Sequence, residues 1–465
     1  MTTTEPGPPD GSGNPVVPPA ADPSSGVPPV AGAPAVDPEV PEDWAPVVRR
    51  NRSRSSGSST APSAPSARTT PSRRRLTFLQ AGLAVLFVLL LVGLGVVGYR
   101  ASLKITGGGS TVTDPKAPGY VAEVQPTPVD LVAVESAKDR LASALIVVGG
   151  ADGKGGTVIP IPPSLVLPAY DGAAPITAGE AYTQGGISSL RERLGPAVTF
   201  GFTSASTVTA EQLGRLVQLT GPLKVQNADN LLEPVNRLDP NYRPAAGGDG
   251  TGTVKYRSGS LTLDGPQLAE YLGFTGEGET VVNQALRQQA AVTALLTGLK
   301  GKDLTGVADA ASGQDASAGS VLADLVSGDV RFDQLPVREQ TVPGTLFKES
   351  VPDDQQLPGF VSRTIPAPIA AFPGQRARTR LLNGTTDAAA ATPLTPDIVA
   401  AGGTVVLLGN AESFDVATSR VEYTAPAAAP AAQAIAAKLG LTATKVKGAD
   451  AGVDVTVVVG RDRLG

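Results

Sequence analysis

Histidine and cysteine are both absent from the 465 residues of this chain. Without cysteine no disulfide can hold a folded part together, so folding must rest on a hydrophobic core. Without histidine there is no Ser-His-Asp or Cys-His nucleophile system and no imidazole ligand for a metal. Any chemistry must therefore come from carboxylates, arginine, lysine or hydroxyl groups.

A strong excess of one charge is also absent, since 38 Lys and Arg stand against 43 Asp and Glu, a net charge of −5. This balance gives no global field that would attract nucleic acid. The one dense basic stretch, arginines between residues 49 and 75, comes directly before an apolar run. We interpret it as a topology signal in preference to a DNA-binding segment.

The longest uncharged apolar run, Leu76 to Tyr99, organises the chain. About 20 apolar residues in a helix span the hydrocarbon core of a bilayer, and a buried helix of a soluble protein normally keeps a polar face. Some 75 residues precede the run, which argues against a cleaved signal peptide. Arg73 to Arg75 abut its start, so the positive-inside rule predicts a single span with a cytoplasmic N-terminus.

The two flanks of this predicted span differ from the rest of the chain. Residues 1–75 are rich in Pro, Gly, Ser, Ala and Thr with few large apolar residues, which predicts a disordered cytoplasmic arm. Residues 100–128 contain a Gly triplet and several prolines and are interpreted as a stalk. Everything after Tyr99 is expected outside the membrane.

Residues 129–345 alternate apolar runs with helical patterns, which predicts an extracytoplasmic α/β or α+β sandwich domain. The expected strands are 131–134, 144–148, 157–161, 198–202 and 330–342, and the expected helices are 186–194, 209–219, 280–300 and 316–326. In the longest helix, the spacing predicts a core face of Val282, Leu286, Gln289, Val292, Leu296 and Leu299. Residues 234–252 are expected to form an exposed loop.

Residues 346–375 are punctuated by proline and lack periodicity, so we expect an interdomain linker there. From residue 376 to 465 strand and helix patterns alternate again, which predicts a compact α/β module. Its expected strands are 379–382, 405–408, 421–423, 444–446 and 453–459, and its expected helices are 396–401 and 427–439. Gly440 fits the left-handed residue that ends many helices.

This last module resembles the LytR C-terminal domain. The string Arg380-Leu-Leu-Asn-Gly-Thr385 is similar to the "V-L-N-G-T" opening of that domain, and Gly402 to Val406 and Asp454 to Gly460 fit the same family. The composition, heavy in Ala, Gly, Val and Pro, resembles that of high-GC actinobacterial proteins.

The larger domain resembles the core of LytR-CpsA-Psr proteins. Gly179 to Gly186 is similar to the family's "N-x-A-Y-x-x-G-G", and Leu216 to Val225 to "L-V-D-x-L-G-G-V-x-V". Leu263 to Tyr271 is similar to "L-x-G-x-x-A-L-x-Y", and Arg287-Gln288-Gln289 matches "R-Q-Q". The four strings occur in the family's order.

The resemblance implies a site that binds a polyprenyl pyrophosphate carrier and transfers its polymer to the cell wall, with acids holding magnesium and arginines facing the phosphates. Most of these charged positions are neutral in this chain. They are Ala142, Pro163, Ser164, Gly273, Thr275 and Gln284. We therefore expect no catalytic residues, no metal ligands and no cofactor, with Mg²⁺ required only if the protein is an active transferase.

The residues that remain as candidate ligand contacts by this resemblance are Arg140, Tyr182, Arg287 and Gln288. Two simpler interpretations stay open. Arg287 could pair with Glu277 or Glu279 of the preceding Gly-rich loop, and Tyr182 could be a packed core aromatic, as could Tyr271. A Gly-rich stretch, Gly149 to Gly156, lacks the Gly-Lys-Ser/Thr ending of a phosphate loop and predicts a hairpin turn.

Three functions remain open on the sequence. The first is a membrane-anchored cell-envelope protein, a non-catalytic relative of the wall-polymer ligases that binds glycopolymer, polyprenyl-phosphate lipid or a partner protein. The second is an active phosphotransferase with relocated catalytic groups. The third is a transcription regulator, which ranks last because the predicted span leaves only the disordered arm inside the cell, and no nucleic acid is expected as a partner.

Overall fold

A computed structural model describes residues 112–136, 138–234, 253–304, 317–341, 348–448 and 452–464. The predicted cytoplasmic arm, the predicted span at 76–99, the first part of the stalk and nearly all of the loop expected at 234–252 lie outside these residues. Within them, no helix combines the length and apolar character that crossing a membrane requires. All the described residues belong to one compact unit.

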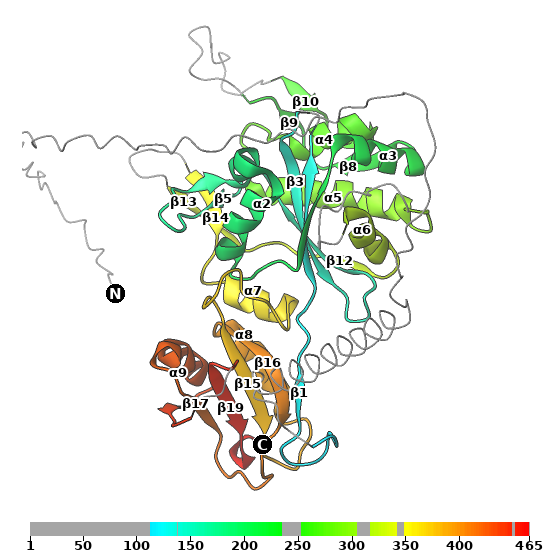
Figure 1. Cartoon of the computed structure of the whole chain (residues 1–465). Helices are drawn as coiled ribbons and strands as arrows, with labels where there is room; N and C mark the ends of the chain where they lie inside the picture. Colours follow the sequence, from blue (N-terminus) through cyan, green and yellow to red (C-terminus); the bar gives the residue numbers. More distant parts are fainter. Residues whose placement is uncertain are drawn as a thin grey trace, which may run out of the picture. The chain divides into compact units, whose positions relative to one another are not determined.

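A five-stranded sheet forms the centre of the larger domain (Figure 1). Its strands, in spatial order, are β12 (Val330–Phe332), β4 (Gly156–Ile161), β3 (Leu141–Gly149), β2 (Val129–Glu135) and β7 (Ser204–Val208). The three middle strands are antiparallel, and the two edge strands run parallel to their neighbours. Buried apolar residues fill both faces of β3, since all but its last residue are buried.

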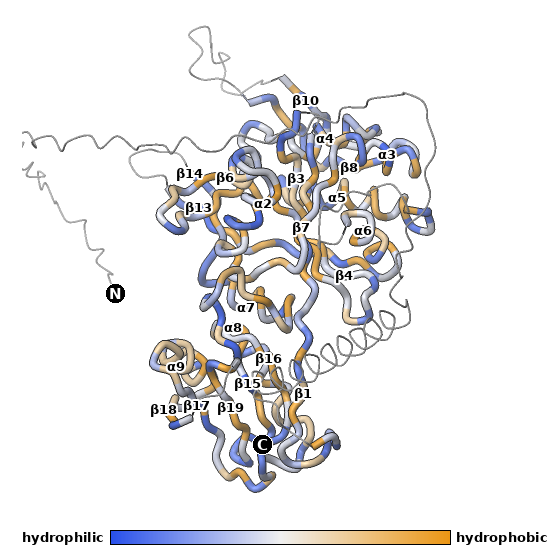
Figure 2. The backbone as a smooth tube through the Cα atoms, viewed as in Figure 1, coloured by the Kyte–Doolittle hydropathy of each residue, from blue (hydrophilic) through white to orange (hydrophobic). Residues whose placement is uncertain are grey.

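Helices cover the two faces of this sheet. One face packs against α3 (Ala210–Thr220), α4 (Gly265–Gly273), α5 (Val281–Leu299) and α6 (Ala318–Val326). The other packs against α2 (Ala178–Val198) and α7 (Leu357–Thr364). Neighbouring residues of β2 alternate between the two cores, as the period of a strand requires, with Val132 in the first and Leu131 in the second. The predicted α/β sandwich is confirmed, and Figure 2 shows hydrophobic residues along its central strands.

Four two-stranded ribbons decorate the sandwich, all antiparallel. They are β5 (Val166–Leu167) with β6 (Ile176–Thr177), β8 (Leu223–Asn227) with β11 (Gly259–Leu263), β9 (Leu231–Leu232) with β10 (Val254–Tyr256), and β13 (Val337–Thr341) with β14 (Lys348–Pro352). The ribbons β8–β11 and β9–β10 lie next to the helices α4 and α5 (Figure 1).

The strand expected at 330–342 is divided into β12 and β13, which belong to different sheets. A second predicted strand is wrong. Residues 198–202 include the end of α2, because Val198 is its last residue and Thr199 takes the left-handed conformation that stops it, with φ 66°. Phe200 and Phe202 suggested a strand, but they anchor an irregular segment in the core beneath α2. The helix itself is longer than predicted and is broken at Gly185 and Gly186, where the backbone leaves helical geometry.

The Gly-rich stretch 149–156 is the hairpin between β3 and β4, as predicted, with Gly149 paired to Gly156. Its glycines permit close backbone approaches. A Cβ atom on Gly155 would lie 2.3 Å from the carbonyl oxygen of Asp329, and one on Gly156 would lie 2.3 Å from that of Val148. Packing therefore explains this glycine pattern.

Residues 346–375, expected to form an aperiodic linker, contain β14 and α7. Leu357, Phe360 and Val361 of α7 are buried in the second core of the larger domain. The prolines that suggested a linker have local roles, since one stands in the first turn of α7, where its missing N–H costs nothing. The longest described stretch of this region without helix or strand is 365–375.

The C-terminal module is a six-stranded sheet with helices α8 (Thr395–Ala400) and α9 (Ala429–Lys438), which confirms the predicted small α/β domain. Its strand order is β1 (Val121–Glu123), β16 (Gly403–Asn410), β15 (Ala377–Asn383), β19 (Val455–Val459), β17 (Arg420–Tyr423) and β18 (Ala443–Lys445). Gly440 ends α9 with φ 66°, as expected. The edge strand β1 was not anticipated, because it comes from the region interpreted as a stalk.

Arg376, at the start of this module, is 7% exposed, and no carboxylate among the described residues pairs with it. Its guanidinium donates to the carbonyl oxygens of Val399 at 2.5 Å, Gly403 at 2.7 Å and Thr199 at 3.2 Å. Burial lowers the pKa of Arg376 from 12.5 to about 10. Since Thr199 belongs to the end of α2, this one side chain ties the module to the larger domain.

Candidate functional site

The candidate site lies where the end of α4 meets the first half of α5. Asp264 caps α4 and Thr280 caps α5, each by accepting a hydrogen bond from a backbone N–H of its helix. The connecting loop, residues 274–280, turns the chain so that the last carbonyl groups of α4 face the side chains of α5. A helix leaves its last four carbonyl oxygens without partners inside the helix.

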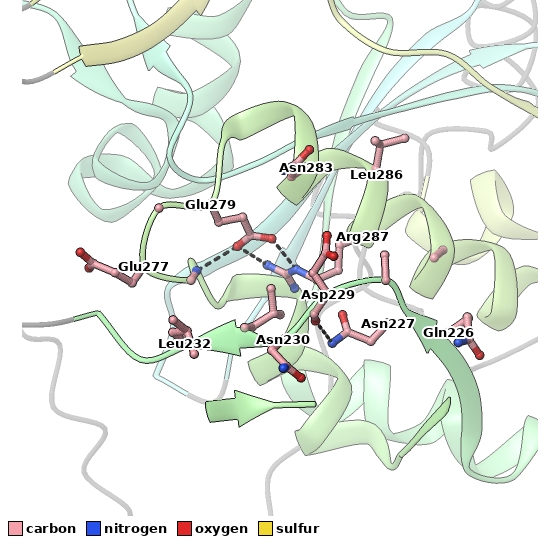
Figure 3. Close-up of a pocket in the computed structure, with 15 residues that line it drawn as sticks. Gln226, Asn227, Asp229, Asn230, Leu232, Glu277, Glu279, Asn283, Leu286 and Arg287 are labelled. Atoms are coloured by element: carbon pink, nitrogen blue, oxygen red, sulfur yellow. Dashed lines mark hydrogen bonds and ion pairs between the residues drawn. The ribbon is translucent and has the colours of Figure 1, made fainter. Parts of the chain in front are cut away.

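Arg287 of α5 supplies partners to two of the carbonyls at this end of α4. Its guanidinium donates to the carbonyl oxygens of Tyr271 and Phe274, and lies over the Tyr271 ring at 4.7 Å from the centroid. It also forms a two-point ion pair with Glu279, with Nε–Oε1 at 2.8 Å and Nη2–Oε2 at 3.1 Å (Figure 3). Both side chains are 5% exposed, so the pairing with Glu279 left open on the sequence is confirmed.

Gln288, the second candidate on α5, is fully buried. Its Nε2 donates to the carbonyl oxygens of Leu272 at 2.9 Å and Ala142 at 3.3 Å. Its Oε1 is also buried and accepts no hydrogen bond from the described residues. Gln288 thus joins the end of α4 to the start of β3.

Gln284 completes the row one turn earlier and is also fully buried. Its Nε2 donates to the carbonyl oxygen of Phe274 at 3.0 Å and to the Thr275 hydroxyl at 3.1 Å. Its Oε1 accepts a hydrogen bond of 2.6 Å from the Ser164 hydroxyl. Ser164, Thr275 and Gln284 therefore form a neutral chain of hydrogen bonds, at three positions where the family resemblance implies charges.

Ala142 and Gly273, two more of those positions, are in direct contact. A Cβ atom added to Gly273 would lie 3.0 Å from the Cα and 3.4 Å from the Cβ of Ala142. Ala142 is fully buried, so its position has no space for a larger side chain unless α4 moves. Pro163, the remaining position, precedes Ser164, and its carbonyl oxygen accepts a hydrogen bond from Gly179 N at 2.9 Å. The fold therefore gathers these positions around one closed, packed junction.

The other two candidates lie around the turn between β2 and β3. Arg140 is exposed in this turn, and its carbonyl oxygen accepts a hydrogen bond from Ser136 N at 2.8 Å. Tyr182 is 5% exposed, as expected of a core aromatic, and its hydroxyl donates to Glu135 Oε1 at 2.5 Å. Burial, with a smaller contribution from Glu135, raises the pKa of Tyr182 well above its usual range.

A pair of aromatic residues closes the junction from the side of β10. Tyr271 is fully buried, donates to Asn227 Oδ1 at 2.8 Å and contacts the Tyr256 ring edge to face, with centroids 5.0 Å apart. Burial raises the pKa of both phenols from 10.0 to about 12. The interpretation of Tyr271 as a core residue is confirmed.

An open pocket of about 310 Å³ adjoins the ion pair (Figure 3). The turn between β8 and β9, the 276–279 loop and the outer face of α5 line it. Its polar side chains are amides and carboxylates, including Gln226, Asp229, Glu277 and Asn283, together with the guanidinium of Arg287, which is paired with Glu279. Leu286 adds an apolar surface that is 48% exposed. Among the described residues there is no group of three or more acidic side chains placed to hold a metal ion.

The core face predicted for α5 is wrong in its first half. Val282 is 40% exposed and Leu286 lines the pocket, whereas Gln284, Arg287 and Gln288 are buried. Apolar spacing misleads here because the carbonyls of α4 and the Glu279 carboxylate offer hydrogen bonds that compensate the burial of polar groups. The pocket residues of the β8–β9 turn were missed, although a mostly polar stretch at the end of β8 and in the turn after it, Gln226 to Asn230, was the available signal.

Comparison with known proteins assigns the C-terminal module. Residues 376–462 match the family model described as LytR cell envelope-related transcriptional attenuator, which confirms the expected LytR C-terminal domain. No curated protein matches the sequence.

Solved structures similar to this chain include TagT and TagV of Bacillus subtilis. TagT shares 15% sequence identity with a TM-score of 0.37, over 55% of this chain and 93% of TagT. TagV shares 14% identity with a TM-score of 0.37, over 50% of this chain and 94% of TagV. A further TagT structure, described as a LytR-CPS2A-psr family protein with bound octaprenyl pyrophosphate lipid, has 14% identity and a TM-score of 0.34, over 53% of this chain and 89% of that chain.

Proposed function

We propose that this chain is a membrane-anchored cell-envelope protein whose larger domain is a non-catalytic relative of the LytR-CpsA-Psr wall-polymer ligases. One observation carries the proposal. The buried polar side chains of α5 already form hydrogen bonds with carbonyl groups at the end of α4 and with Glu279. They therefore cap α4 inside the protein, at the place where the family resemblance implies a pyrophosphate site. The family match of residues 376–462 supports a role in the envelope.

The chemistry of phosphoryl transfer argues against activity at this junction. That reaction depends on cations that neutralise the phosphate oxygens and on acids that hold the metal. The charge of Arg287 is already neutralised by Glu279. The side chain of Gln284 forms hydrogen bonds with the hydroxyl groups of Ser164 and Thr275, and none of the three carries a charge. Loss of a single charge-stabilising donor typically costs about 3–4 kcal/mol of barrier, and several are missing here.

The test is turnover by the purified ectodomain. With a polyprenyl-pyrophosphate-linked glycopolymer, Mg²⁺ and a peptidoglycan acceptor, we expect no release of polyprenyl phosphate. A wall-polymer ligase of the LytR-CpsA-Psr family with established activity is the positive control under the same conditions. Magnesium-dependent turnover that is lost in Arg287→Lys, with the variant still folded by circular dichroism, would overturn the proposal in favour of the relocated-site transferase.

The membrane anchor is part of the same proposal. The apolar run at 76–99 and the arginines before it support a single span with the N-terminus inside and both folded domains outside. Protease added to intact cells stripped of their wall should digest the part after Tyr99 and spare residues 1–75. Protection of the C-terminal domain would contradict this topology, and would restore the regulator as a candidate.

For the pocket beside the ion pair we propose an uncharged, hydroxyl-rich ligand, such as a saccharide of the wall. Asp229 and Glu277 accept hydrogen bonds and cannot donate them, and amides such as Asn283 both donate and accept. A ligand that brings many hydroxyl donors matches this set, whereas a phosphate brings only acceptors and a negative charge. Leu286 offers an apolar surface for the C–H face of a sugar ring.

Calorimetry with soluble peptidoglycan glycan fragments, and with inorganic pyrophosphate as the anionic probe, tests this assignment. We expect the glycan to bind, pyrophosphate not to bind, and Asn283→Ala to weaken the glycan about tenfold through a lost hydrogen bond. Gln218→Ala, an exposed amide on α3, is the matched control. Binding of pyrophosphate in preference to glycan would contradict the assignment, as would retention of a polyprenyl lipid detected by mass spectrometry of the detergent-extracted protein.

A further inference from the structure

The edge strand β1 comes from outside the part of the chain that matches the LytR C-terminal family. It comprises residues 121–123, whereas the match covers residues 376–462. It pairs antiparallel with β16, with Val121 opposite Gly409 and Glu123 opposite Leu407 (Figure 1). The larger domain thus begins after one strand of the C-terminal sheet and ends before the others.

Backbone hydrogen bonds extend the pairing beyond the strand itself. Gly119 N donates to Ala411 O at 2.9 Å, Asn410 N donates to Tyr120 O at 2.7 Å, and Val124 N donates to Val406 O at 2.9 Å. A free sheet edge presents such groups unpaired, and an extended segment that adds to it satisfies them.

The side chain of Asn410 recognises the turn that precedes β1. Its Nδ2 donates to the carbonyl oxygens of Pro115 at 2.9 Å and Ala117 at 2.8 Å. The turn is closed by a hydrogen bond from Tyr120 N to Ala117 O at 3.3 Å. The Asn410 amide has two N–H donors, and both bind carbonyl oxygens of this one turn.

Gly409 provides the space that this approach needs. A Cβ atom at this position would lie 2.1 Å from the carbonyl oxygen of Tyr120 and 2.7 Å from the Cα of Val121. Any other residue at position 409 would therefore displace the segment. Gly409 lets an extended segment approach the β16 backbone closely, and Asn410 binds the turn before that segment. Together they make the end of β16 specific for an extended segment preceded by a turn.

We propose that the β16 edge is a polypeptide-binding site whose ligand is the segment Asp114 to Val124 of the same chain. The LytR C-terminal domain thereby acts as an intramolecular clamp on the stretch that leads into the larger domain. The larger domain becomes an insertion between the first and second strands of the C-terminal fold in chain order. This assignment is independent of whether the larger domain is catalytic.

The absence of cysteine from the native sequence makes the test direct. In the full-length protein, Glu123→Cys with Leu407→Cys places thiols on opposite residues of a pair that is not hydrogen-bonded, where Cα atoms are about 4.5 Å apart. We expect rapid oxidation to an intramolecular disulfide. Glu123→Cys with Arg420→Cys, an exposed residue of β17, is the control and should stay reduced.

Two further variants test the specificity. Gly409→Val should abolish the cross-link and the slow hydrogen exchange of residues 119–124, whereas Gly359→Ala, at a position with nothing within 4 Å, should change neither. Asn410→Ala removes only the side-chain contacts and should speed exchange in this segment about fivefold. Equal cross-linking in both cysteine pairs, a disulfide formed between two chains, or unchanged exchange in Gly409→Val and Asn410→Ala would overturn the proposal.

Discussion

Arg287 and Glu279 form a two-point ion pair in which both side chains are 5% exposed, and the arginine also caps the end of α4. A cation near a helix C-terminus interacts favourably with the helix dipole. The same arginine is one of the few that the resemblance to polymer ligases would assign to phosphate binding. In this chain its charge is balanced inside the protein, next to a pocket that contains further carboxylates.

The first prediction concerns this ion pair. Glu279→Gln leaves the Arg287 charge buried without its counter-ion, and we expect the free energy of unfolding to fall by about 3–5 kcal/mol. Urea denaturation of the purified protein measures the change. Glu211→Gln is the control, because its partner Arg215 is 44% exposed and such surface pairs contribute at most about 1 kcal/mol. Similar losses in the two variants would show that the buried pair has no special role.

The second prediction concerns the contact between Ala142 and Gly273. Gly273→Ala should destabilise the domain by about 1–3 kcal/mol through overpacking, although alanine favours helices. Gly214→Ala, in α3 with nothing within 4 Å, should instead stabilise it by about 0.5–1 kcal/mol. Thermal unfolding of both variants gives the comparison. A stabilised Gly273→Ala would mean that α4 and β3 separate easily.

The third prediction is a loss of stability at high pH. The folded state raises the pKa of Tyr256 and Tyr271 from 10.0 to about 12 by burial, so it retains protons that the unfolded chain releases. Stability is then fully present below pH 10 and falls as the pH rises toward 12.

Denaturation curves at several alkaline pH values measure this loss. The Tyr256 hydroxyl is buried and has no hydrogen-bond partner among the described residues, so Tyr256→Phe should leave neutral-pH stability nearly unchanged and reduce the alkaline loss. An identical alkaline profile in wild type and Tyr256→Phe would exclude this tyrosine as a cause.

The fourth prediction tests the division into two domains. Residues 365–376 contain no helix or strand, so a protease of broad specificity should cut the connection between the two folded domains there. The resulting C-terminal fragment, beginning near Arg376, should remain bound to the rest during gel filtration, because β1 and the Arg376 contacts connect the two parts. Fragments that separate without denaturant would contradict this, and initial cutting within α7 would place the boundary elsewhere.

Local patterns in the sequence were sufficient for most of the regular elements. The helix predicted at 209–219 is α3, at 210–220, and that predicted at 280–300 is α5, at 281–299. Both begin at a threonine cap, Thr209 and Thr280, which is a short-range signal. The continuous apolar runs of β3 and β4 were equally clear signals, since a short uninterrupted apolar run favours a strand that is buried on both faces.

Elements that depend on distant partners could not be predicted in this way. The strand β1, residues 121–123, is too short to show a recognisable strand pattern. Its pairing depends on the shape of β16, which lies some 285 positions later in the chain. The inward orientation of Gln284 and Arg287 likewise depends on carbonyl groups of α4 that no apolar periodicity encodes. The neutral positions of the candidate site were identified from the family resemblance, but that they hydrogen-bond and pack together required the structure.

The contact between Gly273 and Ala142 also limits which substitutions this junction accepts. An aspartate at position 142 would place a carboxylate in a fully buried position against α4, so we expect it to lower stability. Natural proteins tolerate little such loss, because they sit only slightly above the stability that they need. A charged side chain here would require concerted changes in α4, β3 and the Ser164–Gln284 pair, so substitutions introduced one at a time meet a barrier that steric packing maintains.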